Sequence, residues 1–214
     1  MPETNTPTTV IDLHDRLDDL REQLNAARAR RDDLEAKSER LTVVDEADDT
    51  ADDPDTITRQ EATDLEADYA EACEDIREWR FAIARIERSI AEWEGHSLPN
   101  RADRSLDELD SALEEIPVED LNAEFRIQQL AYGARNRVND KLRTRTVNSG
   151  GDDPRTKVGA YDLMMIEEAL VETPSGAPSD PKQLDAPVGS WLAEKVNAYN
   201  SRGETTARDF SLWE

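Results

Sequence analysis

"ATDLEADYAEACEDIREWRFAIARIERSIAEW", residues 62–93, carries apolar side chains in two rows that each repeat every seven residues. The first row is Ala62, Tyr69, Ile76, Ile83 and Ile90. The second row is Leu65, Ala72, Trp79, Ile86 and Trp93. A heptad repeat places both rows on one stripe of an α-helix, the seam of a coiled coil. The stretch therefore predicts a long helix, and it argues against the disorder that a high net charge and few large aliphatic residues would otherwise suggest.

A second heptad stripe precedes it, over residues 10–41. One row is Leu13, Leu20, Ala27, Leu34 and Leu41. The other row begins with Val10, Leu17 and Leu24 and is interrupted by Arg31 and Ser38. Two such stripes predict helices over about 10–42 and 58–94 that cover each other as an antiparallel hairpin of coiled-coil type. A dimer that pairs the stripes between two chains is the alternative.

The segment "VVDEADDTADDPDTIT", residues 43–58, separates the two stripes and shows no periodicity. Its carboxylates and its proline predict a solvated loop. A calcium loop of the EF-hand type would need a glycine at its sixth position and a glutamate at its twelfth, and the acidic run lacks both. We therefore expect no metal here.

The fold class predicted from these patterns is all-α, with an N-terminal helical hairpin and a small C-terminal helical domain. Residues 1–98 form the hairpin, 99–122 a connector helix, 123–200 the small domain and 201–214 a tail. Phe125 and Ile127 alternate with polar residues, which allows one short strand at the start of the small domain.

The charge of the chain is strongly acidic, with 26 Lys and Arg against 50 Asp and Glu and a formal net charge of −24. Such a chain repels itself unless salt screens it, and at about 1 M salt the Debye length is only about 3 Å. An acidic surface with few lysines is typical of proteins from a high-salt cytoplasm. The single cysteine, Cys73, and the lack of a signal peptide or of a long apolar run favour a soluble, cytoplasmic protein.

Groups that could carry chemistry are few. His14 and His96 have no cysteine or carboxylate at metal-ligand spacing, and Cys73 lies beside the second seam, where a thiol usually fills space. The glycines fit neither a phosphate-binding loop nor a dinucleotide fingerprint. We expect no catalytic residue, cofactor or metal, so the sequence predicts that the protein is not an enzyme and acts through partners.

One positive segment stands out, "FRIQQLAYGARNRVNDKLRTR", residues 125–145, with six basic side chains and one acidic side chain. Its basic residues are Arg126, Arg135, Arg137, Lys141, Arg143 and Arg145. Six phosphate contacts would bind nucleic acid with a steep salt dependence, and molar salt would remove most of that driving force. We therefore favour pairing with carboxylates of this chain or of an acidic partner over contact with nucleic acid.

The C-terminal third resembles a known family in the order of its segments. "FRIQQLAYGARNRVNDKL" (125–142) is followed by "YDLMMIEEALVETP" (161–174) and "LDAPVGSWLAEKVNAYN" (184–200). Over about residues 124–200 this order resembles the tail assembly chaperones of long-tailed viruses. The N-terminal hairpin departs from that pattern. The resemblance implies a non-enzymatic helper that coats a long tape-measure protein during tail assembly, in the cytoplasm of the host, and is absent from the finished particle.

A helper of this kind needs helix faces that accept a partner helix. The candidate partner-binding residues are Arg135, Arg137, Lys141, Met164, Met165, Trp191 and Leu192. Paired methionines suit adaptable surfaces, although they also serve as ordinary core residues, and the core interpretation is favoured. The expected partner is a tape-measure-like or other assembly protein, with homo-oligomers as a further option and no membrane contact. The alternatives are a permanent structural coiled-coil component and, third, a nucleic-acid-binding regulator.

Overall fold

The structure is a computed structural model that describes residues 6–44, 56–98, 106–149 and 154–208. The chain divides into two compact units, Leu17–Ala84 and a second unit made of Met1–Arg16 with Arg85–Glu214. Most of the described residues are helical and a few form strands, so the all-α expectation holds only approximately. The domain ranges predicted from the sequence remain predictions, and the acidic loop at 45–55 lies outside the described residues.

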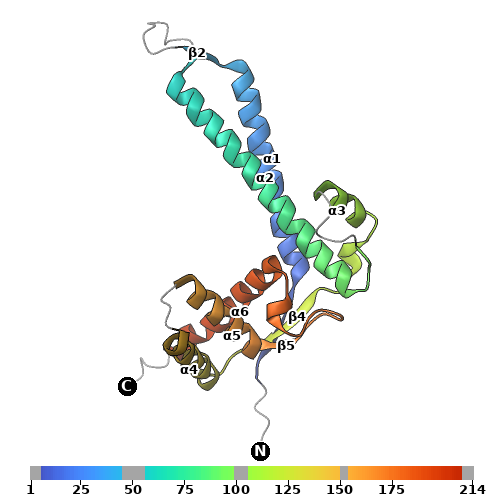
Figure 1. Ribbon diagram of the computed structural model, residues 1–214, viewed down its shortest axis with the longest axis vertical. Coiled ribbons are helices and arrows are strands. Elements are labelled where there is room, and N and C mark those ends of the chain that lie inside the picture. Colours follow the sequence, from blue (N-terminus) through green and yellow to red (C-terminus); the bar gives the residue numbers. More distant parts are fainter. Residues whose placement is uncertain (1–5, 45–55, 99–105, 150–153, 209–214) are drawn as a thin grey trace, which may run out of the picture. The chain divides into compact units, whose positions relative to one another are not determined.

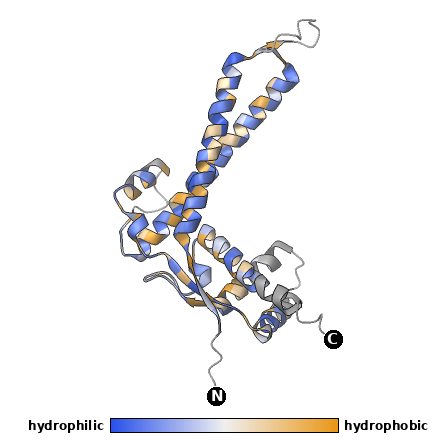
Figure 2. Ribbon diagram, turned by 180° about the vertical axis from the view of Figure 1, so that it is seen from behind, coloured by the Kyte–Doolittle hydropathy of each residue, from blue (hydrophilic) through white to orange (hydrophobic). Residues whose placement is uncertain are grey.

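The unit Leu17–Ala84 consists of parts of two long helices, α1 (Leu13–Arg40) and α2 (Arg59–Trp93), which lie side by side (Figure 1). Arg30 of α1 reaches Asp68 at 3.4 Å and Glu71 at 2.8 Å, both on α2. Two three-residue strands, β2 (Thr42–Val44) and β3 (Thr56–Thr58), pair in parallel. Along both helices hydrophilic residues predominate, and hydrophobic residues are interspersed among them (Figure 2).

Local capping interactions fix both ends of α2. At its start Thr58 and Glu61 form a capping box, in which the Thr58 N–H donates to Glu61 Oε2 at 2.8 Å and the Glu61 N–H donates to Thr58 Oγ1 at 3.3 Å. The pKa of the Glu61 carboxyl is lowered by the bond from the Thr58 N–H and by a second bond from the Thr58 hydroxyl, at 2.9 Å. At its end Gly95 has a φ of 87°, and the N–H of His96 donates to the carbonyl of Ala91 at 3.0 Å. This Schellman arrangement makes Gly95 the residue that ends the helix.

A three-stranded antiparallel sheet forms in the other unit, in the order β1–β4–β5. Its strands are β1 (Thr8–Asp12), β4 (Glu124–Gln128) and β5 (Leu170–Glu172). Phe125 and Ile127 on the central strand are fully buried. The first strand corrects the expected helix start at residue 10. The β-branched run from Thr8 to Ile11 prefers an extended conformation and pairs with β4, so α1 begins only at Leu13.

The remaining helices of this unit are α3 (Leu106–Leu113), α4 (Tyr132–Ser149), α5 (Pro154–Ala169) and α6 (Ala186–Arg208), with 3-10 turns at Val118–Asp120 and Pro181–Gln183. Helix α5 contacts both α4 and α6 (Figure 1). Helix α6 continues to Arg208, eight residues beyond the expected end of the small domain. Gly176 has a φ of 75°, and a Cβ there would collide with the carbonyl of Trp93, so both backbone conformation and space require glycine.

Candidate protein-binding sites

The four apolar residues predicted to contact a partner lie in the core of the unit that contains α5 and α6. Met164 is 7% exposed, Met165 3%, Trp191 3% and Leu192 0%. Their side chains are therefore covered by the chain itself in this conformation. Their role in partner binding remains a prediction, and it requires the unit to open.

An aromatic cluster at the centre of this core explains why Trp191 is covered. Phe125 of β4 makes edge-to-face contacts with Trp93 of α2 and Trp191 of α6, at centroid distances of 5.9 Å and 6.1 Å. The indole Nε1 of Trp191 is buried and has no hydrogen-bond partner among the described residues. The cluster holds α6 and the end of α2 against the sheet.

The three basic residues predicted to contact a partner instead contact groups of their own unit. Lys141 Nζ lies 3.0 Å from Glu168 Oε1, and Arg137 Nη2 lies 3.7 Å from Glu168 Oε2. Arg135 donates to the backbone carbonyl of Asn200. The hydrogen bond from Lys141 is the main cause that holds the pKa of the Glu168 carboxyl below its ordinary value.

Arg126, in the same positive segment, pairs with Glu172 on the neighbouring strand at 3.1 Å. The side chains of Arg143 and Arg145 lie outside those that the structure describes. The described basic side chains of this segment thus form ion pairs with carboxylates on α5 and β5, except for Arg135, which donates to a backbone carbonyl. Whether these cations also serve a partner stays a prediction.

An open apolar groove lies in the other unit, between the C-terminal half of α1 and the N-terminal half of α2. Its volume is about 380 Å³. Every apolar residue that lines it is at least partly exposed, and the largest of them are Leu34, Leu41, Val43, Ile57, Leu65 and Tyr69. Leu17, Leu20 and Ile83, farther along the same two stripes, are buried. The seam is therefore covered in one part of the unit and open in the other.

The position of the groove follows from an interruption that the sequence already contains. Ser38 stands where the heptad row would place a large apolar residue, and it lines the groove. Because its side chain is small, it leaves space that a leucine would fill. The heptad pattern predicts that Leu34, Leu41, Leu65 and Tyr69 are ordinary seam residues, and it does not predict the groove. The polar interruption was the signal that could have revealed it.

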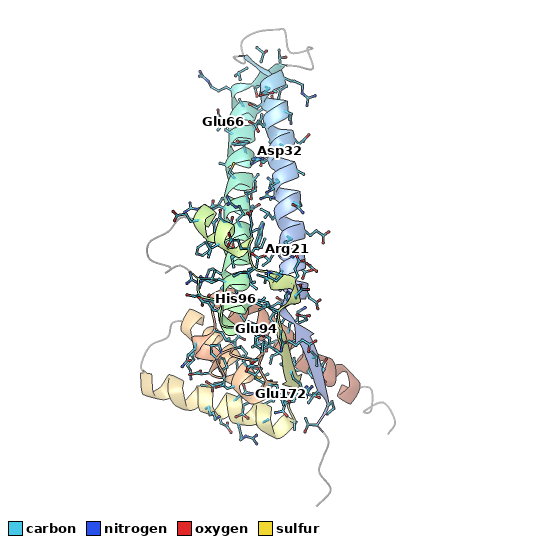
Figure 3. All side chains as sticks on the ribbon, turned by 90° about the vertical axis from the view of Figure 1, so that its right-hand side faces the viewer. Arg21, Asp32, Glu66, Glu94, His96 and Glu172 are labelled. Atoms are coloured by element: carbon cyan, nitrogen blue, oxygen red, sulfur yellow. The ribbon has the colours of Figure 1, made fainter. Side chains whose placement is uncertain are left out.

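The charged residues that line the groove are Glu35, Glu39 and Glu66, and no described lining residue is a cation. Figure 3 shows Glu66 on the part of α2 that follows β3. The pKa of the Tyr69 phenol is raised, chiefly by its interaction with Cys73 and then by the charge of Glu35. Tyr69 is thus uncharged at neutral pH, and the groove has an apolar floor with an acidic rim.

A second hollow, of about 450 Å³, lies along β5 and the turn at Pro181. Lys182, which lines it, pairs with Glu167 at 2.8 Å. Its described walls include the exposed Val171 and three carboxylates, Glu167, Glu172 and Asp180. Two of these carboxylates already form ion pairs, Glu172 with Arg126 and Glu167 with Lys182. The hollow therefore offers a partner less negative charge than the groove between α1 and α2.

The groups considered for chemistry are scattered. His14 Nε2 lies 3.0 Å from the carbonyl oxygen of Leu121, His96 is exposed, and Cys73 is a half-buried free thiol. Within the described residues no three His, Cys, Asp or Glu side chains are grouped to hold a metal ion. No helix in the part of the chain that the structure describes is long and apolar enough to cross a membrane.

Comparisons with protein-family models, with curated proteins and with solved structures found no match.

Proposed function

We propose that this protein is a non-enzymatic assembly factor that binds a long helical protein, in the manner of a tail assembly chaperone. The open groove between α1 and α2 carries the proposal. A partly exposed apolar floor loses the hydrophobic stabilisation that covering it would give, about 25 cal/mol per Å² of apolar surface. A binding partner would supply that cover.

The order of elements between Glu124 and Asn200 supports the same proposal. The short strand β4 precedes the Leu-Ala-Tyr-Gly segment at 130–133, α4 is polar, and α5 and β5 are followed by Pro174. Helix α6 then opens with Pro187, Val188 and Gly189. The tail assembly chaperones that this region resembles have an extended segment and three helices in the same order.

We also propose that α1 and α2 pair within one chain as an antiparallel coiled-coil hairpin. The two heptad stripes, the ion pairs of Arg30 with Asp68 and Glu71, and the burial of Leu17, Leu20 and Ile83 support this pairing. The hairpin would present the groove to a partner in the host cytoplasm, and neither a cofactor nor a metal is needed for this role.

The test is a deletion of the gene in a salt-loving host that supports assembly of the tailed particle, combined with mass spectrometry of purified particles. An assembly chaperone is required for tails of normal length and is absent from the finished particle. A permanent structural component would instead be present in every particle at fixed stoichiometry. Normal particles from the deletion strain would refute both roles.

A further inference from the structure

The chemistry of the groove between α1 and α2 defines what can occupy it. Its apolar floor consists of side chains such as Leu34, Leu41 and Leu65, and its rim carries Glu35, Glu39 and Glu66. A volume of about 380 Å³ is at the small end of the range for ligand pockets, about 300–1,000 Å³. The groove can therefore accept a few apolar side chains from an element that continues outside it.

The cations that neighbour the rim acids along α1 each have contacts outside the groove, and Arg31 also interacts with Glu35 of the rim. Arg31 lies 2.5 Å from Asp32, and Arg40 donates from Nε to the carbonyl of Ala36 at 2.9 Å. The positive charge of Lys37 helps to lower the pKa of the Glu61 carboxyl. The rim thus keeps a negative potential that a positively charged occupant would complement.

The geometry also selects the type of element. An added strand would have to pair with β2 or β3, and each has only three residues, which offers few backbone hydrogen bonds. A helix can instead place side chains spaced by three and four residues into a groove between two helices. A second copy of this chain would bring another acidic surface, from a molecule of net charge −24, against the same rim.

We propose that the groove binds an amphipathic helix of another protein, one that carries Lys or Arg on both sides of its apolar face. This inference rests on the proposed function and adds the chemistry of the partner to it. The apolar face covers the floor of the groove, and the basic flanks meet Glu35, Glu39 and Glu66. In molar salt the contribution of the flanks is limited to direct contacts, because the Debye length is only about 3 Å.

Fluorescence anisotropy with labelled synthetic peptides of about 18 residues, long enough to form a helix, tests the proposal on the full-length protein. The first peptide has leucines at helical spacing with lysine flanks. The second replaces the lysines by glutamates, and the third has the composition of the first in an order that destroys its amphipathic face. Only the first peptide should bind, in 0.3 M and in 1 M KCl, and more tightly at the lower salt.

Two variants locate the binding site. Ser38→Phe fills the groove, and a triple variant, Glu35→Gln, Glu39→Gln and Glu66→Gln, neutralises its rim. Each should weaken binding of the lysine peptide at least about tenfold in 0.3 M KCl. The matched control replaces three exposed acids that do not line the groove, Glu22→Gln, Asp33→Asn and Glu74→Gln, and should bind as the parent does.

Several results would overturn the proposal. Equal weakening by the control triple would mean that only diffuse charge attracts the peptide. Tight binding of the glutamate peptide, or no binding of any peptide, would exclude a basic helical partner. A dimer of the parent protein that Ser38→Phe dissociates would assign the groove to a second copy. Each variant must first show the helical circular dichroism and melting temperature of the parent.

The same variants separate this proposal from the proposed function. If Ser38→Phe loses peptide binding and still supports normal tails in the deletion strain, the protein is an assembly factor that does not use the groove. If the groove binds the lysine peptide and the deletion strain assembles normal particles, the groove assignment stands and the assembly role is wrong.

Discussion

Asn200, on α6, accepts a hydrogen bond at 2.7 Å from the backbone N–H of Leu130, which lies seventy residues earlier, just after β4. The Asn200 side chain is buried and donates from Nδ2 to the carbonyl of Val196 at 2.8 Å. Its own carbonyl accepts a hydrogen bond from Arg135 of α4. One residue thus joins α6 to the segment between β4 and α4 and to α4 itself.

Asn200→Ala should lower the free energy of unfolding by about 1–3 kcal/mol, because it leaves the buried N–H of Leu130 without its acceptor. Urea unfolding in 2 M KCl measures the loss. Ser201→Ala is the control, since Ser201 is exposed and should change stability by less than about 0.5 kcal/mol. Equal stability of the two variants would show that the Asn200 side chain does not hold α6 in place.

The ion pairs of Glu168 predict a contribution to stability that depends on pH. Its pKa is lowered in the folded state, first by the hydrogen bond from Lys141. The contribution is therefore fully present above the pKa of the unfolded state and is lost as the pH falls through the lower folded pKa. Lys141→Gln should cost at most about 1 kcal/mol at pH 7, because Lys141 is more than half exposed, and nothing below the folded pKa.

Carbon-13 NMR of the Glu168 carboxyl provides the direct measurement for this pair. Its pKa should rise towards the ordinary value in Lys141→Gln and stay unchanged in the control Lys37→Gln on α1. An unchanged pKa in Lys141→Gln would contradict the ion pair.

Ile83→Asp should destabilise the protein by more than about 3 kcal/mol, because it places an unpaired charge at a position that is only 9% exposed. Glu78→Gln, at an exposed position of the same helix, should be within about 0.5 kcal/mol of the parent. Thermal unfolding followed by circular dichroism distinguishes the two. If both variants melt together, the buried seam of α2 has been assigned to the wrong face.

Nucleic-acid retention should stay at background in gel-shift assays at 0.1 M and 1 M salt. The reason is that basic side chains of the positive segment already pair with carboxylates of the chain. Arg137 and Lys141 pair with Glu168, and Arg126 pairs with Glu172. The triple variant Arg135→Gln, Arg137→Gln and Lys141→Gln should look the same as the parent in this assay. Tight binding by the parent that persists at 1 M salt and disappears in the triple variant would favour the alternative function, a nucleic-acid-binding regulator.

Salt should stabilise the fold as a whole. We expect a higher melting temperature in 2 M KCl than in 0.1 M KCl, with loss of helical circular dichroism beginning below about 0.2 M, where self-repulsion of the −24 charge is less screened. Potassium and sodium chloride should act alike. An unchanged melting temperature between 0.1 M and 2 M would exclude adaptation to high salt.

Heptad spacing was enough to predict the two long helices, because the 3.6-residue period of an α-helix is written directly into the order of apolar residues. Local chemistry likewise fixed the end of α2 at Gly95, since the left-handed backbone there suits glycine. These features depend on neighbours within a few residues of each other, and they can be read without the rest of the chain.

Other features required the tertiary structure. The run from Thr8 to Ile11 becomes a strand because β4, more than a hundred residues later, offers a partner edge. The apolar candidates Met164, Met165, Trp191 and Leu192 suit either a core or a binding surface, and the packing of their own unit covers them. The groove beside Ser38 exists because the opposing helix does not fill the space that a small residue leaves. Periodicity can be read from the order of the residues, whereas burial, strand pairing and open space depend on contacts between segments far apart in the chain.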